Sequence, residues 1–344
     1  MQSRIKYIDI AKGISIFLVA MYHSHLKVFI PDLVDAMALF RVPLFFFLAG
    51  LFFSDAMSLK RFLLKKSDAL LKPYFSVLLV YFLMAILFQN TWLPGIFYGN
   101  GLTIPHDWAQ LWFLTHLFSV YCFCYLLHRF SKFPMQSNYI KYCTCLLLLV
   151  VGTTLVDRFW FASINIFGVK KELPGLPFSL DLIFITSAFF IFGHSLKDKL
   201  TKFSPNIIYL TLSVIIFLSV VCFTEASINL NQRIYSYPIF SSLGALSGIY
   251  MVMCISWLFS KQPFLCKMLL LVGESSLFIL IFHRYIESAV FNYWATESTG
   301  DIQLIIVACL SLFFSIFIPI LIKHLVIKSR FLSLFFFPFK RKAM

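Results

Sequence analysis

A lysine and a histidine share the first apolar segment of the chain. In "YIDIAKGISIFLVAMYHSHL", residues 7–26, Lys12 and His23 are eleven residues apart. On an α-helix this spacing gives about 16 Å of rise and a rotation of only some 20°, so both side chains lie on one stripe at two depths. A cation can bind phosphate, and an imidazole can accept and return a proton. The spacing therefore favours phosphate contact at Lys12 and proton transfer at His23.

Structural explanations exist for the same residues. Asp9 precedes Lys12 by three residues and can pair with it, which would leave Lys12 as a cation of the inner membrane surface. His23 could hold two helices together through a hydrogen bond. His25 is two residues beyond His23 and points away from it, so the two do not form a metal clamp, and His25 is expected at the outer interface.

Further polar side chains interrupt apolar segments at a comparable outer depth. They are Arg41, Trp112, His116, Asp181, His283, Arg284 and Glu287. Each could be an interface anchor, and Trp112 is typical of the aromatic belt. Ionisable side chains at membrane depth are costly, however, and usually mark functional sites. Several of them from different segments at one level predict a polar cavity that opens outwards.

The elements that position these residues are predicted to be membrane helices. The chain has 344 residues, of which 60% are apolar and only 13% are charged, and it contains 43 Phe. This composition excludes a soluble domain of ordinary size. Apolar runs of about 17 to 25 residues, the length that crosses a bilayer as a helix, recur throughout. Ten spans are predicted, at residues 8–28, 39–55, 73–90, 109–128, 139–157, 178–196, 206–223, 236–259, 268–287 and 302–323. The expected fold is an all-α integral membrane protein, a bundle of about ten transmembrane helices.

The formal net charge of +14 could indicate a nucleic-acid partner, but the positions of the basic residues argue against it. With the N-terminus in the cytoplasm, 22 of the 29 lysines and arginines fall on the inner side. This asymmetry follows the positive-inside rule. It predicts that both termini and residues 60–72 are cytoplasmic, and that residues 91–108 and 158–177 lie outside.

The remaining features predict one domain. The first apolar run lacks a small-residue cleavage site, so no cleaved signal peptide is expected. The eight cysteines lie mostly within spans, and their two Cys-x-Cys pairs lack zinc-site spacing and histidine partners, so no metal site is predicted. Without a linker or a clear repeat, residues 1–344 are expected to form a single transmembrane domain with no soluble C-terminal domain.

Five segments in order resemble a known family. They are "KGISIFLVAMYH" (12–23), "VPLFFFLAGLFF" (42–53), "LWFLTHLFSVY" (111–121), "LDLIFITSAFFIFGHSL" (180–196) and "VGESSLFILIFHRYI" (272–286). The chain resembles acyltransferase family 3, the integral-membrane acyltransferases that modify cell-surface glycans, and is most similar to the branch related to sugar O-acetylases. A basic residue, ten intervening residues and a histidine mark the first helix of that family.

Two positions depart from the family pattern. Many members have arginine where this chain has Lys12, and lysine binds phosphate as a point charge instead of a planar fork. Many also have an Arg-x-x-Arg pair before the third span, whereas "LLKKSDALLKPY" offers Lys65, Lys66 and Lys72. The charge is kept and the spacing is not, so no residue of this segment is assigned a role.

The resemblance implies an O-acyltransferase of the cell inner membrane. The implied co-substrate is cytoplasmic acyl-CoA, in particular acetyl-CoA, with no bound cofactor. The implied acceptor is a hydroxyl of a surface polysaccharide or a lipid-linked sugar. Lys12 would bind the donor, and His23 would be the catalytic residue, as general base or as transient acyl carrier. The residues implied on the acceptor or oxyanion side are Arg41, Trp112, His116, His283 and Arg284.

Two other function classes are compatible with these residues. A transporter or flippase for a small solute or a lipid-linked sugar would use the same polar groups for binding and proton relay. Many such proteins contain internal repeats, and none is visible in this sequence. A membrane scaffold without chemistry would leave the polar groups at outer depth unexplained.

Overall fold

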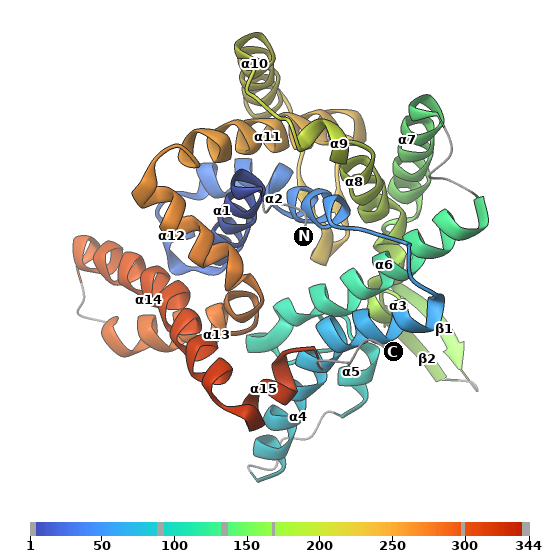
Figure 1. Ribbon diagram of the computed structural model, residues 1–344. Helices are drawn as coiled ribbons and strands as arrows, with labels where there is room; N and C mark the ends of the chain where they lie inside the picture. Colours follow the sequence, from blue (N-terminus) through green and yellow to red (C-terminus); the bar gives the residue numbers. More distant parts are fainter. Residues whose placement is uncertain (1–4, 88–92, 132–136, 167–168, 297–299, 339–344) are drawn as a thin grey trace. The chain divides into compact units, whose positions relative to one another are not determined.

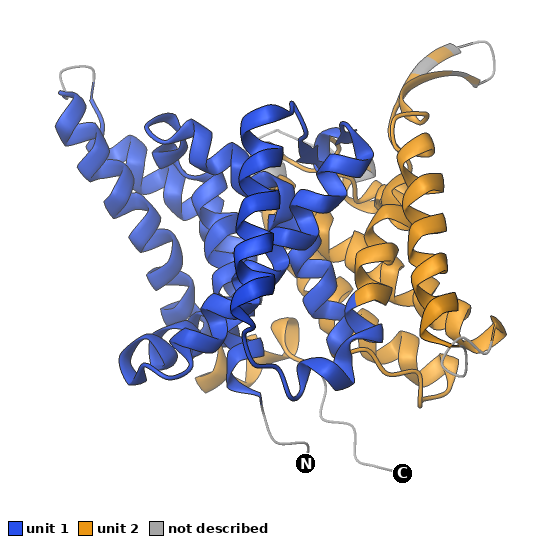
Figure 2. Cartoon of the chain, turned by 90° about the horizontal axis from the view of Figure 1, so that it is seen from above, with its two compact units in different colours: residues 1–51, 193–323 blue, residues 52–192, 324–344 orange. Residues whose placement is uncertain are grey.

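The computed structural model describes residues 5–87, 93–131, 137–166, 169–296 and 300–338 (Figure 1). The described residues are mostly α-helical, with two short antiparallel hairpins, β1–β2 and β3–β4. The expected all-α class is therefore confirmed. The chain divides into two compact units, shown in different colours in Figure 2: residues 1–51 with 193–323, and residues 52–192 with 324–344.

The first unit combines the N-terminal helices with the elements that follow α8. Its elements are α1 (Lys6–His23), η1 (His25–Val28), α2 (Pro31–Leu51), α9 (Lys197–Leu200), α10 (Ile207–Phe223), β3 (Ile228–Asn229), η6 (Leu230–Gln232), β4 (Ile234–Tyr235), α11 (Pro238–Phe259), α12 (Pro263–Glu274), α13 (Ser276–Trp294) and most of α14 (Asp301–Lys328).

The second unit contains the intervening elements and the last helix. They are α3 (Leu59–Lys66), η2 (Ser67–Leu71), α4 (Lys72–Leu87), α5 (Leu93–Tyr98), η3 (His106–Leu111), α6 (Trp112–Ser131), α7 (Asn138–Leu155), β1 (Trp160–Ile166), β2 (Val169–Pro174), η5 (Pro177–Leu182), most of α8 (Ile183–Ser195) and α15 (Arg330–Phe336).

Helix α1 is the centre of the first unit. It packs against α2, α11, α12 and α13 (Figure 1). Two glycines bring α1 and α12 into backbone contact: a Cβ on Gly13 would lie 2.3 Å from the carbonyl oxygen of Leu269, and one on Gly273 would lie 2.4 Å from that of Asp9. Because only glycine lets two helix backbones approach this closely, these positions fix α12 against the half of α1 that carries Lys12.

Each of the ten predicted apolar runs coincides with helical structure. In the described part of the chain, six helical segments are long and apolar enough to cross a membrane, and the bent pair α12–α13 makes a seventh if it counts as one span. The remaining three predicted runs correspond to α1, α4 and α10, which are shorter or carry charges. The number of ten spans stays a prediction. Residues 88–90 of the third predicted span lie outside the described residues, as do the basic residues Arg4, Lys132, Lys340, Arg341 and Lys342.

Two predicted span boundaries are wrong. The second span was expected at 39–55, but α2 begins at Pro31, so Arg41 lies in the middle of the helix and not at its start. The acidic residues Asp32 and Asp35 lower the hydropathy of the first turns, although a proline at the first position and an acidic first turn are helix-start signals.

The ninth span, predicted as one run over 268–287, is broken. The axes of α12 and α13 differ by 81° at Ser275. The sequence there is Gly-Glu-Ser-Ser, and glycine–serine pairs are a known cause of sharp helix bends. Lys323 stabilises the break, because its Nζ donates a hydrogen bond to the carbonyl oxygen of Glu274 at 2.8 Å and lies 3.3 Å from Ser275 Oγ.

Candidate active site

Helix α1 carries both residues that the sequence singled out. Lys12 and His23 lie on one uninterrupted helix, and His23 is its last residue. Lys12 Nζ lies 3.3 Å from Asp9 Oδ1, with 31% of the lysine side chain exposed, so the predicted pair is confirmed. The pair is only part-buried, because the lysine side chain keeps some exposure while Asp9 is buried, and a phosphate can compete for the lysine.

His23 is half-buried and makes no hydrogen bond to any residue that the structure describes. Its ring meets the edge of Tyr22, with centroids 5.0 Å apart, and lies 5.3 Å from the ring of His283 on α13, tilted by 49°. The positive charges of Arg41, Arg284 and Lys27 act on this ring electrostatically. His23 therefore does not serve as the hydrogen-bonded bridge between helices that the sequence left open as an alternative.

His283 has one engaged and one unengaged nitrogen. The ring is fully buried, and its Nδ1 lies 2.7 Å from the carbonyl oxygen of Ile279 and 3.1 Å from that of Leu280. Its Nε2 is buried without a hydrogen-bond partner in the described part of the chain. Buried polar atoms normally have partners, so this nitrogen is a functional candidate.

Arg41 is a buried cation held on an aromatic face. It is only 5% exposed, and its guanidinium carbon lies 3.6 Å from the centroid of the Tyr22 ring. Tyr22 is positioned in turn by Asn229, whose Nδ2 donates to its hydroxyl oxygen at 3.2 Å. Asp35 attracts the guanidinium, yet Arg41 Nη1 is buried with no hydrogen-bond partner among the described residues. This N–H group can stabilise a negative charge that forms beside His23.

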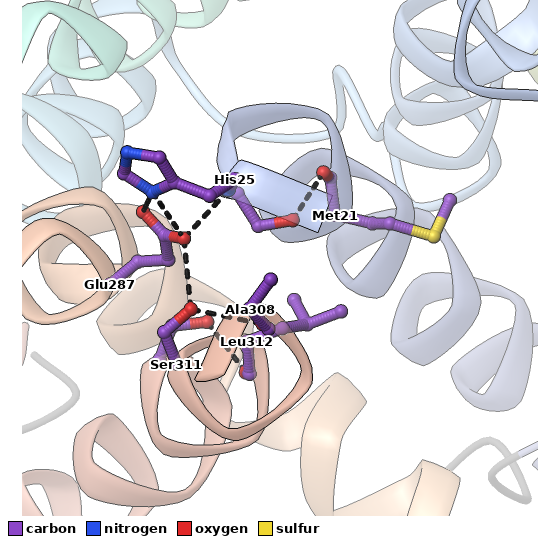
Figure 3. Close-up of polar contacts among 8 residues, drawn as sticks. Met21, His25, Glu287, Ala308, Ser311 and Leu312 are labelled. Atoms are coloured by element: carbon purple, nitrogen blue, oxygen red, sulfur yellow. Dashed lines mark hydrogen bonds and ion pairs between the residues drawn. The ribbon is translucent and has the colours of Figure 1, made fainter. Parts of the chain in front are cut away.

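A buried carboxylate holds the segment that follows His23 (Figure 3). Glu287 is 1% exposed, and its Oε1 accepts a hydrogen bond from the backbone N–H of His25 at 2.8 Å. The same oxygen lies 3.0 Å from His25 Nδ1 and 3.0 Å from Ser311 Oγ on α14. The His25 ring also stacks on Phe291 at 3.6 Å.

The sequence did not predict this network. His25 was expected simply at the outer interface, but its ring and backbone are both bound to Glu287. The signal was present in part, since Glu287 is one helical turn beyond His283 on the same face of α13. Ser311 gave no signal, because serine is common in apolar membrane helices.

Trp112, His116 and Asp181, also singled out by the sequence, lie in the second unit. His116 is fully buried, with Nε2 2.9 Å from Thr186 Oγ1 and Nδ1 3.2 Å from the carbonyl oxygen of Phe178. Trp112 lies beside it, with ring centroids 5.6 Å apart. Asp181 accepts a hydrogen bond from the backbone N–H of Leu176 at 3.1 Å. These contacts are typical of residues that hold segments together.

The lysines of the basic segment around the start of α4 make specific contacts and are not all exposed to solvent. Lys66 Nζ lies 3.2 Å from the centroid of the Tyr121 ring, and burial together with the neighbouring charge of Lys65 lowers the pKa of Lys66 to about 7. Lys72 pairs with Asp68 at 2.8 Å.

In the described part of the chain, no group of three or more His, Cys, Asp or Glu side chains could hold a metal ion.

The first unit thus combines the groups that acyl transfer requires. Within the described residues, His23 makes no hydrogen bond and can act as base or nucleophile, while His283 Nε2 and Arg41 Nη1 are buried without a hydrogen-bond partner. Acyl transfer needs these functions because a tetrahedral oxyanion forms and a proton leaves the attacking group.

Comparison with known proteins agrees with this chemistry. The family model of the acyltransferase domain matches residues 5–324, which include α1, α2 and α13. A search of curated proteins and a search of solved structures each found no match. The family match spans nearly the whole chain, and several of its helices are long and apolar enough to cross a membrane. The chain therefore belongs to acyltransferase family 3 and is a multi-pass membrane acyltransferase.

Proposed function

We propose that this protein is an O-acyltransferase that moves an acyl group, most simply acetyl, from cytoplasmic acyl-CoA to a hydroxyl of a surface polysaccharide or a lipid-linked sugar. In this proposal the protein lies in the cytoplasmic membrane with both termini inside. Acyl-CoA is a substrate and not a resident cofactor.

The first helix links the two substrates. Lys12 binds the donor phosphates near the inner surface, and the pantetheine arm extends along α1 toward His23, about 16 Å away along the helix axis. Beyond Lys12 the helix runs against α12, where Gly13 and Gly273 remove side-chain bulk between the backbones.

The outer end of the helix carries the chemistry. His23 acts as general base or as transient acyl carrier. The Arg41 guanidinium stabilises the oxyanion, and His283 and Arg284 contribute to the acceptor side. Trp112 and His116 remain proposed acceptor-side residues, although both ring nitrogens of His116 are engaged.

The observation that carries this proposal is His23 itself. In a member of an acyltransferase family, an imidazole without a hydrogen-bond partner in the described part of the chain lies beside a second imidazole, on the same helix as an inner-surface cation. A histidine in such a place is costly unless it has a function.

Mass spectrometry of surface polysaccharide tests the function. Matched strains with the gene, without it, and with the His23→Ala variant are compared. We expect an added mass of one acyl group only in the strain with the unaltered gene, and the size of that mass identifies the donor. Identical glycans in all three strains would refute a glycan acyltransferase, and a change in the amount of polysaccharide without a change in its acylation would favour the flippase alternative.

A further inference from the structure

The buried ring of His283 is held in one protonation pattern. Carbonyl oxygens can only accept hydrogen bonds, so the contacts of Nδ1 with Ile279 and Leu280 require that Nδ1 carries the proton. In a neutral imidazole the other nitrogen, Nε2, then has a free lone pair. A charged ring would be a fully buried ion with no carboxylate contact among the described residues, which is far more costly than a neutral one.

The lone pair of Nε2 calls for a hydrogen-bond donor. The atom is buried and has no partner in the part of the chain that the structure describes. Leaving a buried acceptor unpaired is costly, so a site built this way is completed by a ligand group that donates a hydrogen bond. A sugar hydroxyl is such a donor, whereas the thioester group itself has no N–H or O–H to donate.

The neighbouring ring, His23, differs from His283 in that its protonation pattern is not fixed. Among the described residues, no carbonyl or carboxylate is bonded to His23 to fix which of its nitrogens carries the proton, and its ring lies 5.3 Å, centroid to centroid, from that of His283. A hydroxyl bonded to His283 Nε2 is therefore close to any group attached to His23. Tyr22 touches both His23 and Arg41, which brings the bare Arg41 Nη1 to the same place.

We propose that His283 is a second catalytic residue, the proton acceptor for the acceptor hydroxyl, and that His23 carries the acyl group between the two substrates. This inference rests on the proposed function and assigns one role to each imidazole.

The two steps balance. In the first, a nitrogen of His23 attacks the thioester carbonyl, the carbon–sulfur bond breaks, and the proton released from the imidazole goes to the CoA thiolate. In the second, the acceptor hydroxyl gives its proton to His283 Nε2 while its oxygen attacks the acyl carbon. The bond to His23 breaks, and the proton on His283 returns to the His23 nitrogen. The products are free CoA and an acyl ester, and both histidines are restored.

Two variants separate this role from packing. In His283→Asn, the side-chain amide can keep the hydrogen bond to the backbone carbonyl that Nδ1 now contacts, but it lacks the ε nitrogen. His283→Gln reaches the ε position with a group that is not a base. Tyr285→Phe is the matched control, because Tyr285 is two residues away and 53% exposed.

Two reactions are measured in membranes that contain the native polysaccharide, with acetyl-CoA as the probe. The first is exchange of label between acetyl-CoA and free CoA, which needs only an acyl carrier. The second is acetylation of the polysaccharide. We expect His23→Ala to lose both, and His283→Asn and His283→Gln to retain exchange while acetylation falls at least about 100-fold. Tyr285→Phe should retain both.

Several outcomes would overturn the inference. Acetylation at the unaltered rate in His283→Asn would remove the proton-acceptor role, and the absence of exchange in the unaltered protein would remove the acyl carrier. Loss of exchange in both His283 variants at normal protein levels would show that His283 supports the fold of the site. Each of these leaves the proposed function standing if the unaltered protein acetylates polysaccharide, whereas no acetylation by the unaltered protein would refute the function itself.

Discussion

At the scale of single residues, hydrogen-bond partners separate the candidate functional groups from residues with structural contacts. His23, His283 and Arg41 each present a nitrogen without a hydrogen-bond partner in the described part of the chain, while both nitrogens of His116 are engaged and His25 is bound to Glu287. A buried polar group gains nothing from remaining unpaired, so the unpaired nitrogens are where a substrate is expected.

This difference predicts unequal effects for two histidines separated by one residue. His23→Ala should abolish acyl transfer while the protein remains folded and inserted. His25→Ala should retain most of the activity, because the backbone N–H of His25 still donates to Glu287 after the ring is removed. Polysaccharide acylation at matched membrane levels of the two variants is the measurement. Full activity in His23→Ala would end the mechanism, and disappearance of the protein would mean that His23 has a packing role.

Lys66 gives a pH-dependent prediction. Its pKa is about 7 in the folded protein, against about 10.4 for an unperturbed lysine, so between these values the unfolded chain binds more protons than the folded one. Stability should therefore rise with pH across this window. The change of stability with pH is measured by thermal unfolding of the detergent-solubilised protein and of the Lys66→Met variant. The range of about pH 6.5 to pH 10 covers the two pKa values. The variant should show the smaller rise, and equal slopes would contradict the prediction.

At the scale of elements, close backbone contact sets the position of α12 against α1. Gly13 and Gly273 allow α12 to lie against α1, and the 81° bend at Ser275 then directs α13 so that His283 meets His23.

Gly13→Ala should therefore be destabilising. Its added Cβ would lie 2.3 Å from a backbone carbonyl oxygen, so the two helices must separate, at a cost of about 1–3 kcal/mol. Gly300→Ala is the control, since a Cβ there meets no described atom within 4 Å. Thermal unfolding in detergent should show a lower midpoint for Gly13→Ala alone, and equal midpoints would show that α1 and α12 adjust without cost.

At the scale of the whole molecule, the distribution of charge predicts how the chain crosses the membrane. Most lysines and arginines fall in alternate polar segments, which the positive-inside rule assigns to the cytoplasm. That orientation brings Lys12 to the side where acyl-CoA is found, so the topology and the donor proposal depend on each other.

Cysteine labelling of intact cells checks this topology. Lys60→Cys and Glu172→Cys are suitable because both positions are exposed, and the exposed native cysteines Cys143, Cys222 and Cys309 are first replaced by serine. An impermeant maleimide should label position 172 in intact cells and position 60 only after lysis. Labelling of position 60 from outside would refute the predicted orientation.

The sequence by itself determined the class of the protein, most of its helices and the placement of Lys12 and His23 on one helix. Hydropathy and helical periodicity are properties of neighbouring residues, so the apolar runs, the spacing of Lys12 and His23 and the Asp9–Lys12 pair were all predictable. Only the tertiary structure decided which nitrogens are unpaired. Whether His116 or His283 has a bare nitrogen depends on carbonyl and hydroxyl groups that packing brings to it, and the contact of His25 with Glu287 joins residues 262 positions apart. Hydropathy also did not predict where helices begin and break. Asp32 beside Pro31 and the serines around the bend lower the mean hydropathy, whereas the backbone there follows local hydrogen bonds and close packing.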